Sequence, residues 1–188
     1  KCESIGVIPS DDGEYQLWMV VNRFINGSTR RTVEYLNEFN FGDTQDDAFF
    51  MDSGLTYDSV PTTTLSGLDH LEGETVTILA DGASHADKVV SGGDIALDRS
   101  AQKVHVGLGY TSLLQTLRIE TGSAQGVAQS KIKRINEITI RMHKTLGLEV
   151  GGDLDNMENI PFRSSSALMD VPISLFTGDK TIEFRDDY

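Results

Sequence analysis

Paired carboxylates are the side chains of this sequence whose type and spacing are best suited to chemistry. The pairs are Asp11-Asp12, Asp46-Asp47, Glu72 with Glu74, Asp153 with Asp155, and Asp186-Asp187. Two carboxylates about 5–10 Å apart in a cleft hydrolyse glycosidic bonds. Most of these pairs stand in turn-like segments, where aspartate is expected to bind backbone groups. A glycosidase acting on cell wall therefore stays as an alternative, and we predict no catalytic residue among the pairs.

The histidines are the second set of chemically capable side chains: His70, His85, His105 and His143. None is paired with another histidine or a cysteine at a spacing typical of metal ligands. The chain also lacks the Gly-x-Ser-x-Gly segment that would hold a serine nucleophile. Since His105 and His143 alternate with apolar residues, we expect both at partly exposed sheet positions. The sequence predicts no metal site and no enzyme.

Two glycine-rich segments match ligand-binding loops only in part. Residues 151–156 (G-G-D-L-D-N) open like a calcium loop, but the glycine and glutamate of its sixth and twelfth positions are missing. Gly107-Leu-Gly109 and Gly92-Gly93 are too short for a dinucleotide fingerprint, and no helical pattern follows them. Cys2 is the single cysteine, and we interpret it as an incidental thiol. We therefore predict no cofactor.

The overall composition indicates a β protein. The 188 residues include 18 glycines and 38% apolar side chains, which suits turn-rich sheets better than helical bundles. A net charge of −13 disfavours phosphate contacts, so we expect no specific nucleic-acid binding. No apolar run reaches about 18 residues and no signal peptide is present, so we expect no membrane anchor. The chain lacks an initiator methionine and ends after a strand-like run, and we interpret it as a fragment of a longer protein.

The charge is distributed unevenly along the chain. Residues 1–60 hold eleven acidic and four basic side chains, a net charge of −7. Residues 118–144 hold six basic and two acidic side chains, a net charge of +4. This basic island is either a patch for a partner or the solvated face of a strand.

Residues 66–110 predict a small, tightly turned β-module. Three alternating apolar runs carry the pattern: Val76-Ile78-Ala80, Ile95-Leu97 and Val104-Val106-Leu108. Each run gives a strand one face ready for burial. Asp81-Gly82 supplies a tight turn, another run starts at Val89, and Gly92-Gly93 breaks it. The spacing is typical of a small antiparallel barrel or sandwich, which we place at residues 54–112.

Residues 1–53 predict an antiparallel meander. A first strand begins near Ile5, and residues 15–23 form a second strand rich in aromatic and branched side chains. Asn26-Gly27 is a strong hairpin signal, and residues 31–36 form the returning strand. Such a meander is one strand short of a propeller blade. Its open edges suggest that neighbouring blades have been cut away or come from elsewhere.

The other segments complete an all-β, mainly antiparallel fold with little helix. Residues 113–188 are expected to complete the sheets, with a long surface loop at residues 151–176. Residues 132–148 fit a helical stripe or a strand, and their β-branched side chains favour a strand. The shorter predicted elements are a strand at 48–51, an extended linker at 61–64 and a last strand at 181–184.

Several segments of the module read D-S-G-L-T-Y-D, L-S-G-L-D-H-L-E-G-E-T-V-T-I-L-A-D-G, V-S-G-G-D-I-A-L-D and V-H-V-G-L-G-Y. They resemble the tail nozzle proteins of short-tailed bacteriophages, also called tail tubular protein B or stabilisation-type proteins. The resemblance continues through residues 133–141, 145–147 and 176–179, and upstream through L-W-M-V-V-N-R-F-I-N-G and R-T-V-E-Y-L. A phrase similar to G-L-D-H-L-E-G-E-x-V also occurs in hub and tip proteins of longer tails.

The resemblance implies a structural protein of the phage tail with no catalytic residues. Members of this family are several times longer and form a homo-oligomeric ring below the portal and adaptor. The ring closes the exit channel for DNA and lets DNA pass transiently at infection. The implied partners are copies of itself, portal and adaptor proteins, and tail fibres. The implied location is the virion, after assembly in the bacterial cytoplasm.

A carbohydrate-binding β-module of a tail fibre or secreted protein is the alternative function. Such a module needs exposed aromatic side chains on one sheet face, where sugar rings stack. Trp18, Tyr15 and Tyr35 are the candidates, although the same rings also suit packing in a core.

Overall fold

The structure is a computed structural model. It describes residues 1–10, 13–37, 44–117, 135–168 and 171–183. Within these ranges all regular elements are β-strands except two short 3-10 helices, so the all-β, mainly antiparallel fold is confirmed. The chain divides into two compact units, one of residues 1–110 with 170–172 and the other of residues 111–169 with 173–188.

The first unit begins with the predicted antiparallel meander. It consists of β1 (Cys2–Pro9), β2 (Tyr15–Ile25) and β3 (Ser28–Tyr35), with β2 in the middle. Asn26 and Gly27 have φ angles of 44° and 73°, the left-handed pair that a two-residue hairpin turn requires. Ile25 therefore pairs directly with Ser28, which sets the register of the whole hairpin.

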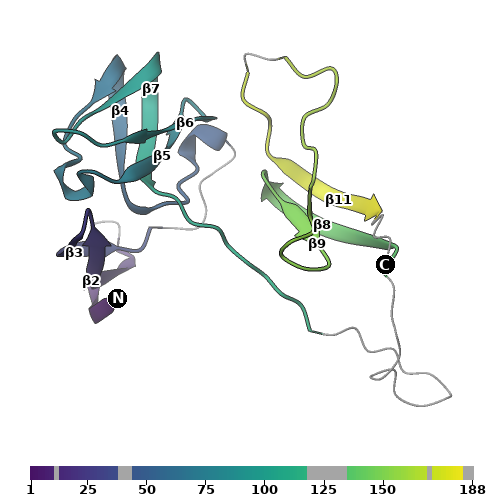
Figure 1. Cartoon of the computed structure of the whole chain (residues 1–188), viewed down its shortest axis with the longest axis horizontal. Helices are drawn as coiled ribbons and strands as arrows, with labels where there is room; N and C mark the ends of the chain where they lie inside the picture. The colour runs from purple at the N-terminus through teal and green to yellow at the C-terminus, as the bar shows by residue number, and fades with distance from the viewer. Residues whose placement is uncertain (11–12, 38–43, 118–134, 169–170, 184–188) are drawn as a thin grey trace. The chain divides into compact units, whose positions relative to one another are not determined.

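A four-stranded antiparallel sheet follows in the same unit (Figure 1). Its strands are β4 (Asp52–Leu65), β5 (Thr75–Ala80), β6 (Ala83–Val89) and β7 (Ile95–Leu108), in the order β4-β7-β5-β6. The 3-10 helix η2 (Asp69–Leu71) lies between β4 and β5. Since β4 and β6 do not pair with each other, the sheet is not closed into a barrel.

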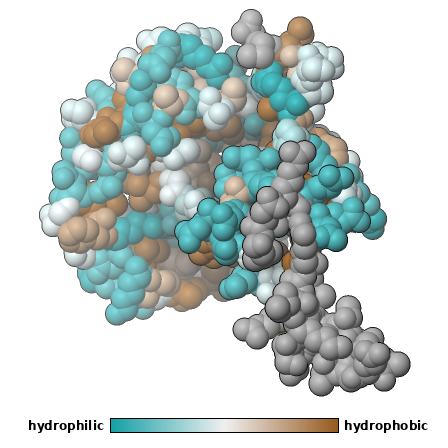
Figure 2. All heavy atoms as spheres, turned by 45° about the vertical axis from the view of Figure 1, so that its right-hand side comes forward, coloured by the Kyte–Doolittle hydropathy of each residue, from teal (hydrophilic) through white to brown (hydrophobic). Residues whose placement is uncertain are grey.

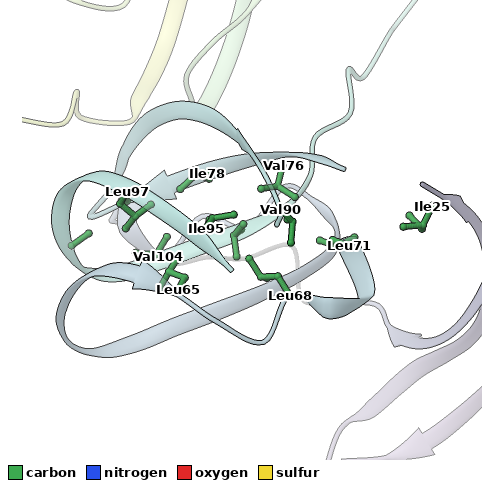
Figure 3. Close-up of a cluster of buried hydrophobic side chains, with 13 residues drawn as sticks. Ile25, Leu65, Leu68, Leu71, Val76, Ile78, Val90, Ile95, Leu97 and Val104 are labelled. Carbon is green, nitrogen blue, oxygen red and sulfur yellow. The ribbon is translucent and has the colours of Figure 1, made fainter. Parts of the chain in front are cut away.

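The core of the first unit lies in this module, as the alternating runs predicted. Val76, Ile78 and Ala80 of β5 are almost fully buried, and the inward side chains of β7 pack against them (Figure 3). Ile25 at the end of β2 belongs to the same cluster, so the meander contributes to the module's core. The labelled members in Figure 3 are Ile25, Leu65, Leu68, Leu71, Val76, Ile78, Val90, Ile95, Leu97 and Val104.

Several predicted boundaries in this unit are wrong. Residues 48–51 form no strand; the 3-10 helix η1 (Gln45–Asp47) precedes them and β4 begins only at Asp52. Residues 61–64 belong to β4 rather than to a linker, because this strand lies at a sheet edge where proline is tolerated. The strand predicted from Val89 runs from Ala83 instead, since it follows the Asp81-Gly82 turn directly.

The second unit contains two small antiparallel pairs. The strands β8 (Glu137–Thr145) and β11 (Phe176–Glu183) pair with each other, which confirms a strand in the ambiguous region over the described residues. The strands β9 (Glu149–Gly151) and β10 (Met157–Asn159) form a hairpin. The loop predicted at residues 151–176 is therefore partly strand. Residues 132–134 and Phe184 lie outside the described residues.

Candidate functional site

The carboxylate pairs in the described residues are bound to backbone and lysine groups rather than gathered in a cleft. Glu72 accepts hydrogen bonds from the amides of Gly92 at 3.0 Å and Gly93 at 2.8 Å, and these bonds lower its pKa. Glu74 accepts one from the Asn26 amide at 2.6 Å. These contacts order turns of the first unit. The pairs Asp11-Asp12 and Asp186-Asp187 lie outside the described residues.

In the calcium-like segment at residues 151–156, the Asp153 carboxylate binds neighbouring groups of the same segment. Asp153 Oδ1 accepts hydrogen bonds from the amides of Asp155 and Asn156, each at 2.9 Å. The Asn156 side chain donates to both carboxylate oxygens, and it is the main cause of the lowered pKa of Asp153. In the described part of the chain, no three His, Cys, Asp or Glu side chains are arranged to hold a metal ion.

His105 is buried, so the predicted partly exposed position is wrong for this residue. Its side chain lies on β7 with an exposed fraction of 4%. Nε2 donates to the carbonyl oxygen of Asp46 at 2.8 Å, and Nδ1 lies 2.8 Å from Thr56 Oγ1. The Phe49 ring meets the imidazole edge-on at 5.4 Å. His105 thus holds η1 and Phe49 against the sheet, whereas His143 is exposed on β8.

An ion pair also holds residues 44–50 against β7. Lys103 of β7 donates a hydrogen bond to the Asp47 carboxylate, and Thr44 Oγ1 donates to Asp47 at 2.6 Å. The Lys103 ammonium, followed by the Thr44 hydroxyl, lowers the pKa of Asp47. In the predicted pair Asp46-Asp47, the Asp47 carboxylate therefore binds Lys103. The Asp46 carbonyl oxygen accepts a hydrogen bond from His105. Together these contacts fix residues 44–50 beside β7.

Replacing His105 by alanine is expected to destabilise residues 44–50 by about 1 kcal/mol, because the Asp46 carbonyl and Thr56 hydroxyl lose a buried partner. In the His105→Ala variant, amide hydrogen exchange should be faster at residues 44–50 than in β5. His143→Ala is the matched control, since its side chain is exposed on β8 and its removal should leave exchange at residues 44–50 unchanged. Equal exchange in both variants would contradict the fastening role.

A groove of about 800 Å³ lies in the first unit between β3 and the beginning of β4. Residues 32–37 line one wall and residues 49–56 line the other, each as an unbroken run. Met19, Val21 and Arg23, alternate residues of the central strand β2, also line the groove, so one face of the meander forms part of it. We call this feature the edge groove.

A network of charged groups joins the two walls of the edge groove. Arg23 of β2 binds Glu34 of β3 in a fork, with Nε–Oε1 at 2.9 Å and Nη2–Oε2 at 2.7 Å. Its Nη1 reaches Asp52 at the start of β4 at 3.1 Å. The hydroxyls of Thr32 and Ser53 each donate to Glu34 Oε1 at 2.7 Å. The charges in the groove are thus largely paired with one another.

Electrostatics in this network strongly favour the ionised form of Glu34. The Arg23 guanidinium is the main cause, with added bonds from Ser53 and Thr32, and the pKa of Glu34 falls to about 2. The same fork raises the pKa of Arg23. Sequence reasoning missed this network. The available signal was an arginine within β2, a strand that is otherwise rich in apolar residues.

The aromatic side chains proposed for sugar stacking do not share one face. Trp18 pairs with Tyr35 across β2 and β3, and their ring centroids are 5.3 Å apart. Tyr15 stands three residues before Trp18 in the same strand, so it points to the opposite face. The Trp18 indole nitrogen is buried and has no hydrogen-bond partner in the described part of the chain. The ring pair therefore packs as a small cluster on one side of the meander.

The basic island is only partly described. Arg118, Lys131, Lys133 and Arg134 lie outside the described residues. Arg141 on β8 binds Asp179 on β11 in a fork, with both bonds at 2.8 Å. One positive charge of the island is therefore neutralised across the strand pair, where the guanidinium lowers the pKa of Asp179.

No model of a known protein family matches this chain, and no curated protein matches it in sequence. Among the described residues, no helix has the length and apolar character needed to cross a bilayer. In the space-filling view, brown apolar side chains lie scattered among polar ones on the visible surface (Figure 2). The edge groove, which lies between the meander and the beginning of β4, is the strongest candidate for a functional site that the geometry offers.

Proposed function

We propose that this chain is a structural component of a bacteriophage tail, a nozzle-like subunit of a ring that forms or closes the DNA exit channel. The observation that carries the proposal is the combination of open sheet edges with exposed apolar side chains beside them. Within the described residues, β1 and β3 are the edges of one sheet, and β4 and β6 are the edges of the other. Exposed edges pair readily with another chain unless they are covered.

The meander carries exposed apolar side chains on both faces. Ile5, Val7 and Tyr15 lie on one face, and all three are more than half exposed. Val33 and Phe24 lie on the opposite face and are also mostly exposed. A sheet that is apolar on both faces suits packing between two further sheets, as in a propeller. This supports a subunit that is completed by neighbouring structure.

The charge of the chain agrees with a conduit for DNA. A net charge of −13 gives a surface that repels phosphate, so a wall made of this protein would not retain passing DNA. A ring also needs contacts in which two different surfaces of one subunit meet their counterparts on its neighbours. The two sheets of the first unit offer several such edges.

Electron microscopy of the full-length gene product tests the proposal. We expect annular particles of several subunits in negative stain, and light scattering should give a mass several times that of one chain. Mixing with the portal and adaptor proteins from the same genome should produce a larger coaxial complex. Monomers under all conditions, with no binding to portal or adaptor, would contradict the proposal.

A further inference from the structure

The side chain of His85 joins β6 to a bend in β7. Among the described residues, β6 pairs only with β5, and residues 97–100 of β7 have no register partner in β4 or β5. The imidazole of His85 crosses this interval, where the Asp98 amide donates a hydrogen bond to Nε2 at 2.9 Å. The side chain is 4% exposed, so the bond is shielded from water. We call this feature the His85 bridge.

A β-bulge in β6 is part of the same arrangement. The register between β6 and β5 shifts by one residue between His85 and Lys88, so β6 holds one residue more than β5 in this interval. Such a bulge disrupts the ladder locally and leaves backbone groups that need another partner. The Ala86 carbonyl oxygen lies in the bulge, and His85 Nδ1 binds it at 2.7 Å.

The two hydrogen bonds of the ring fix the position of its proton. The Ala86 carbonyl oxygen can only accept, so Nδ1 carries the proton. The Asp98 amide can only donate, so Nε2 must offer a lone pair. The His85 bridge therefore requires a neutral imidazole that is protonated at Nδ1.

The charged groups around the bridge come from β6 and β7. Asp98 Oδ2 lies 3.5 Å from His85 Nε2, and Lys88 Nζ binds Asp98 Oδ1 at 2.6 Å. The lysine bond is the main cause of the lowered pKa of Asp98, so this carboxylate stays ionised at neutral and mildly acidic pH. Arg99 of β7 binds a backbone carbonyl oxygen of β5 at 2.7 Å, and Asp87 is the other charged residue of β6. The sequence of β5, T-V-T-I-L-A, contains no ionisable side chain.

A second proton on the ring removes the acceptor of the bridge. The proton would come from solvent and occupy the lone pair of His85 Nε2, so that two N–H groups would face each other. The imidazolium can bind the Asp98 carboxylate instead, in competition with Lys88. The Asp98 amide, and with it the bend in β7, then loses its bond to β6.

His105 is also buried but has no such restriction. Its Nε2 donates to the carbonyl oxygen of Asp46, while Nδ1 faces the Thr56 hydroxyl at 2.8 Å. A hydroxyl can donate or accept, so it can accept a hydrogen bond from a protonated Nδ1. His105 therefore keeps both of these bonds in either charge state, whereas the backbone amide opposite His85 cannot change its role.

We propose that the His85 bridge is an acid-sensitive switch, which holds the bend of β7 to β6 while the imidazole is neutral and releases it when the ring takes up a second proton. Histidine is the side chain whose charge ordinarily changes between about pH 5 and 8. Since β6 is an edge strand among the described residues, release frees one edge of the sheet for other contacts. The inference goes beyond the proposed function and does not depend on it, because it concerns the first unit alone.

NMR of the 188-residue chain labelled with ¹⁵N tests the tautomer and the switch. At pH 8 the ring signals of His85 should show a proton on Nδ1 and none on Nε2. As the pH falls to about 5, the Asp98 amide signal should shift with the same midpoint as the ring signals. The protection factor of this amide against hydrogen exchange should fall about fivefold, as expected for the loss of one hydrogen bond. A proton on Nε2 at pH 8, or an Asp98 amide that keeps its signal and its protection, would overturn the proposal.

Two substitutions separate the switch from general effects of acid. His85→Gln keeps a donor and an acceptor but does not titrate, so the protection factor of the Asp98 amide should be equal at pH 8 and pH 5. His143→Gln changes an exposed histidine of β8 and should keep the wild-type response. A wild-type response in His85→Gln, or its loss in His143→Gln, would overturn the role of His85. Urea unfolding verifies that both variants fold, and the wild-type spectra decide the proposal by themselves if His85→Gln does not.

Discussion

Replacing Ile25 by alanine is expected to lower the free energy of unfolding of the first unit by about 3 kcal/mol. Ile25 is 3% exposed and, among the described residues, is the member of the core cluster that comes from the meander. It lies on the side of the cluster where Leu71 is found (Figure 3). Truncation therefore leaves a cavity at the point where the meander joins the module.

Urea unfolding of the wild-type and Ile25→Ala chains, followed by tryptophan fluorescence, measures this loss. Trp18 stands in the meander, so its emission also reports whether the meander separates before the module unfolds. Phe24→Ala is the matched control, because this neighbour is 74% exposed and its truncation should cost less than about 0.5 kcal/mol. Similar losses in the two variants would show that Ile25 does not join the two sheets.

The sequence predicted the strands whose register depends on local chemistry. Asn26-Gly27 and Asp81-Gly82 both adopt the left-handed φ angles that two-residue hairpins need, so the strands around them were located correctly or nearly so. The burial of Val76, Ile78 and Ala80 followed from their alternation alone. These features involve residues close together in the chain, where periodicity and turn preferences decide the structure.

The boundaries that the sequence missed depend on contacts between distant segments. Residues 48–51 are apolar and read as a strand, yet His105 binds the backbone of Asp46 and packs on Phe49, which holds this segment against β7 in an irregular path. The length of β4 was also missed, because its pairing with β7 tolerates irregular register near Pro61. Local propensity does not contain this tertiary information.

The edge groove was beyond prediction for the same reason. Arg23 and Glu34 stand on neighbouring strands, and Ser53 enters from another sheet of the unit with a left-handed φ of 49°. The network that fixes the groove exists only once the meander and the module are docked. The resemblance to tail nozzle proteins suggested other copies of the chain as partners, but it named no residues that would form a contact between the copies.

Replacing Glu34 by glutamine is expected to destabilise the first unit by about 2 kcal/mol at neutral pH, since a forked bond to Arg23 and two hydroxyl bonds lose their charged acceptor. Arg23 is then left half-buried with Asp52 as its remaining carboxylate partner in the network. Urea unfolding at pH 7 measures the difference. Glu149→Gln, which changes an exposed carboxylate on β9, is the control and should have little effect.

The same pair of variants gives a pH dependence with a definite sign. The folded-state pKa of Glu34 is about 2, below its usual value of 4.5, so the folded chain favours the ionised carboxylate. Its stabilisation is complete above pH 4.5 and is lost as the pH falls from there towards 2. The difference in unfolding free energy between wild type and Glu34→Gln should therefore shrink over this interval. If the difference stays constant, the ionised carboxylate does not hold the groove walls together, and another contact must set their spacing.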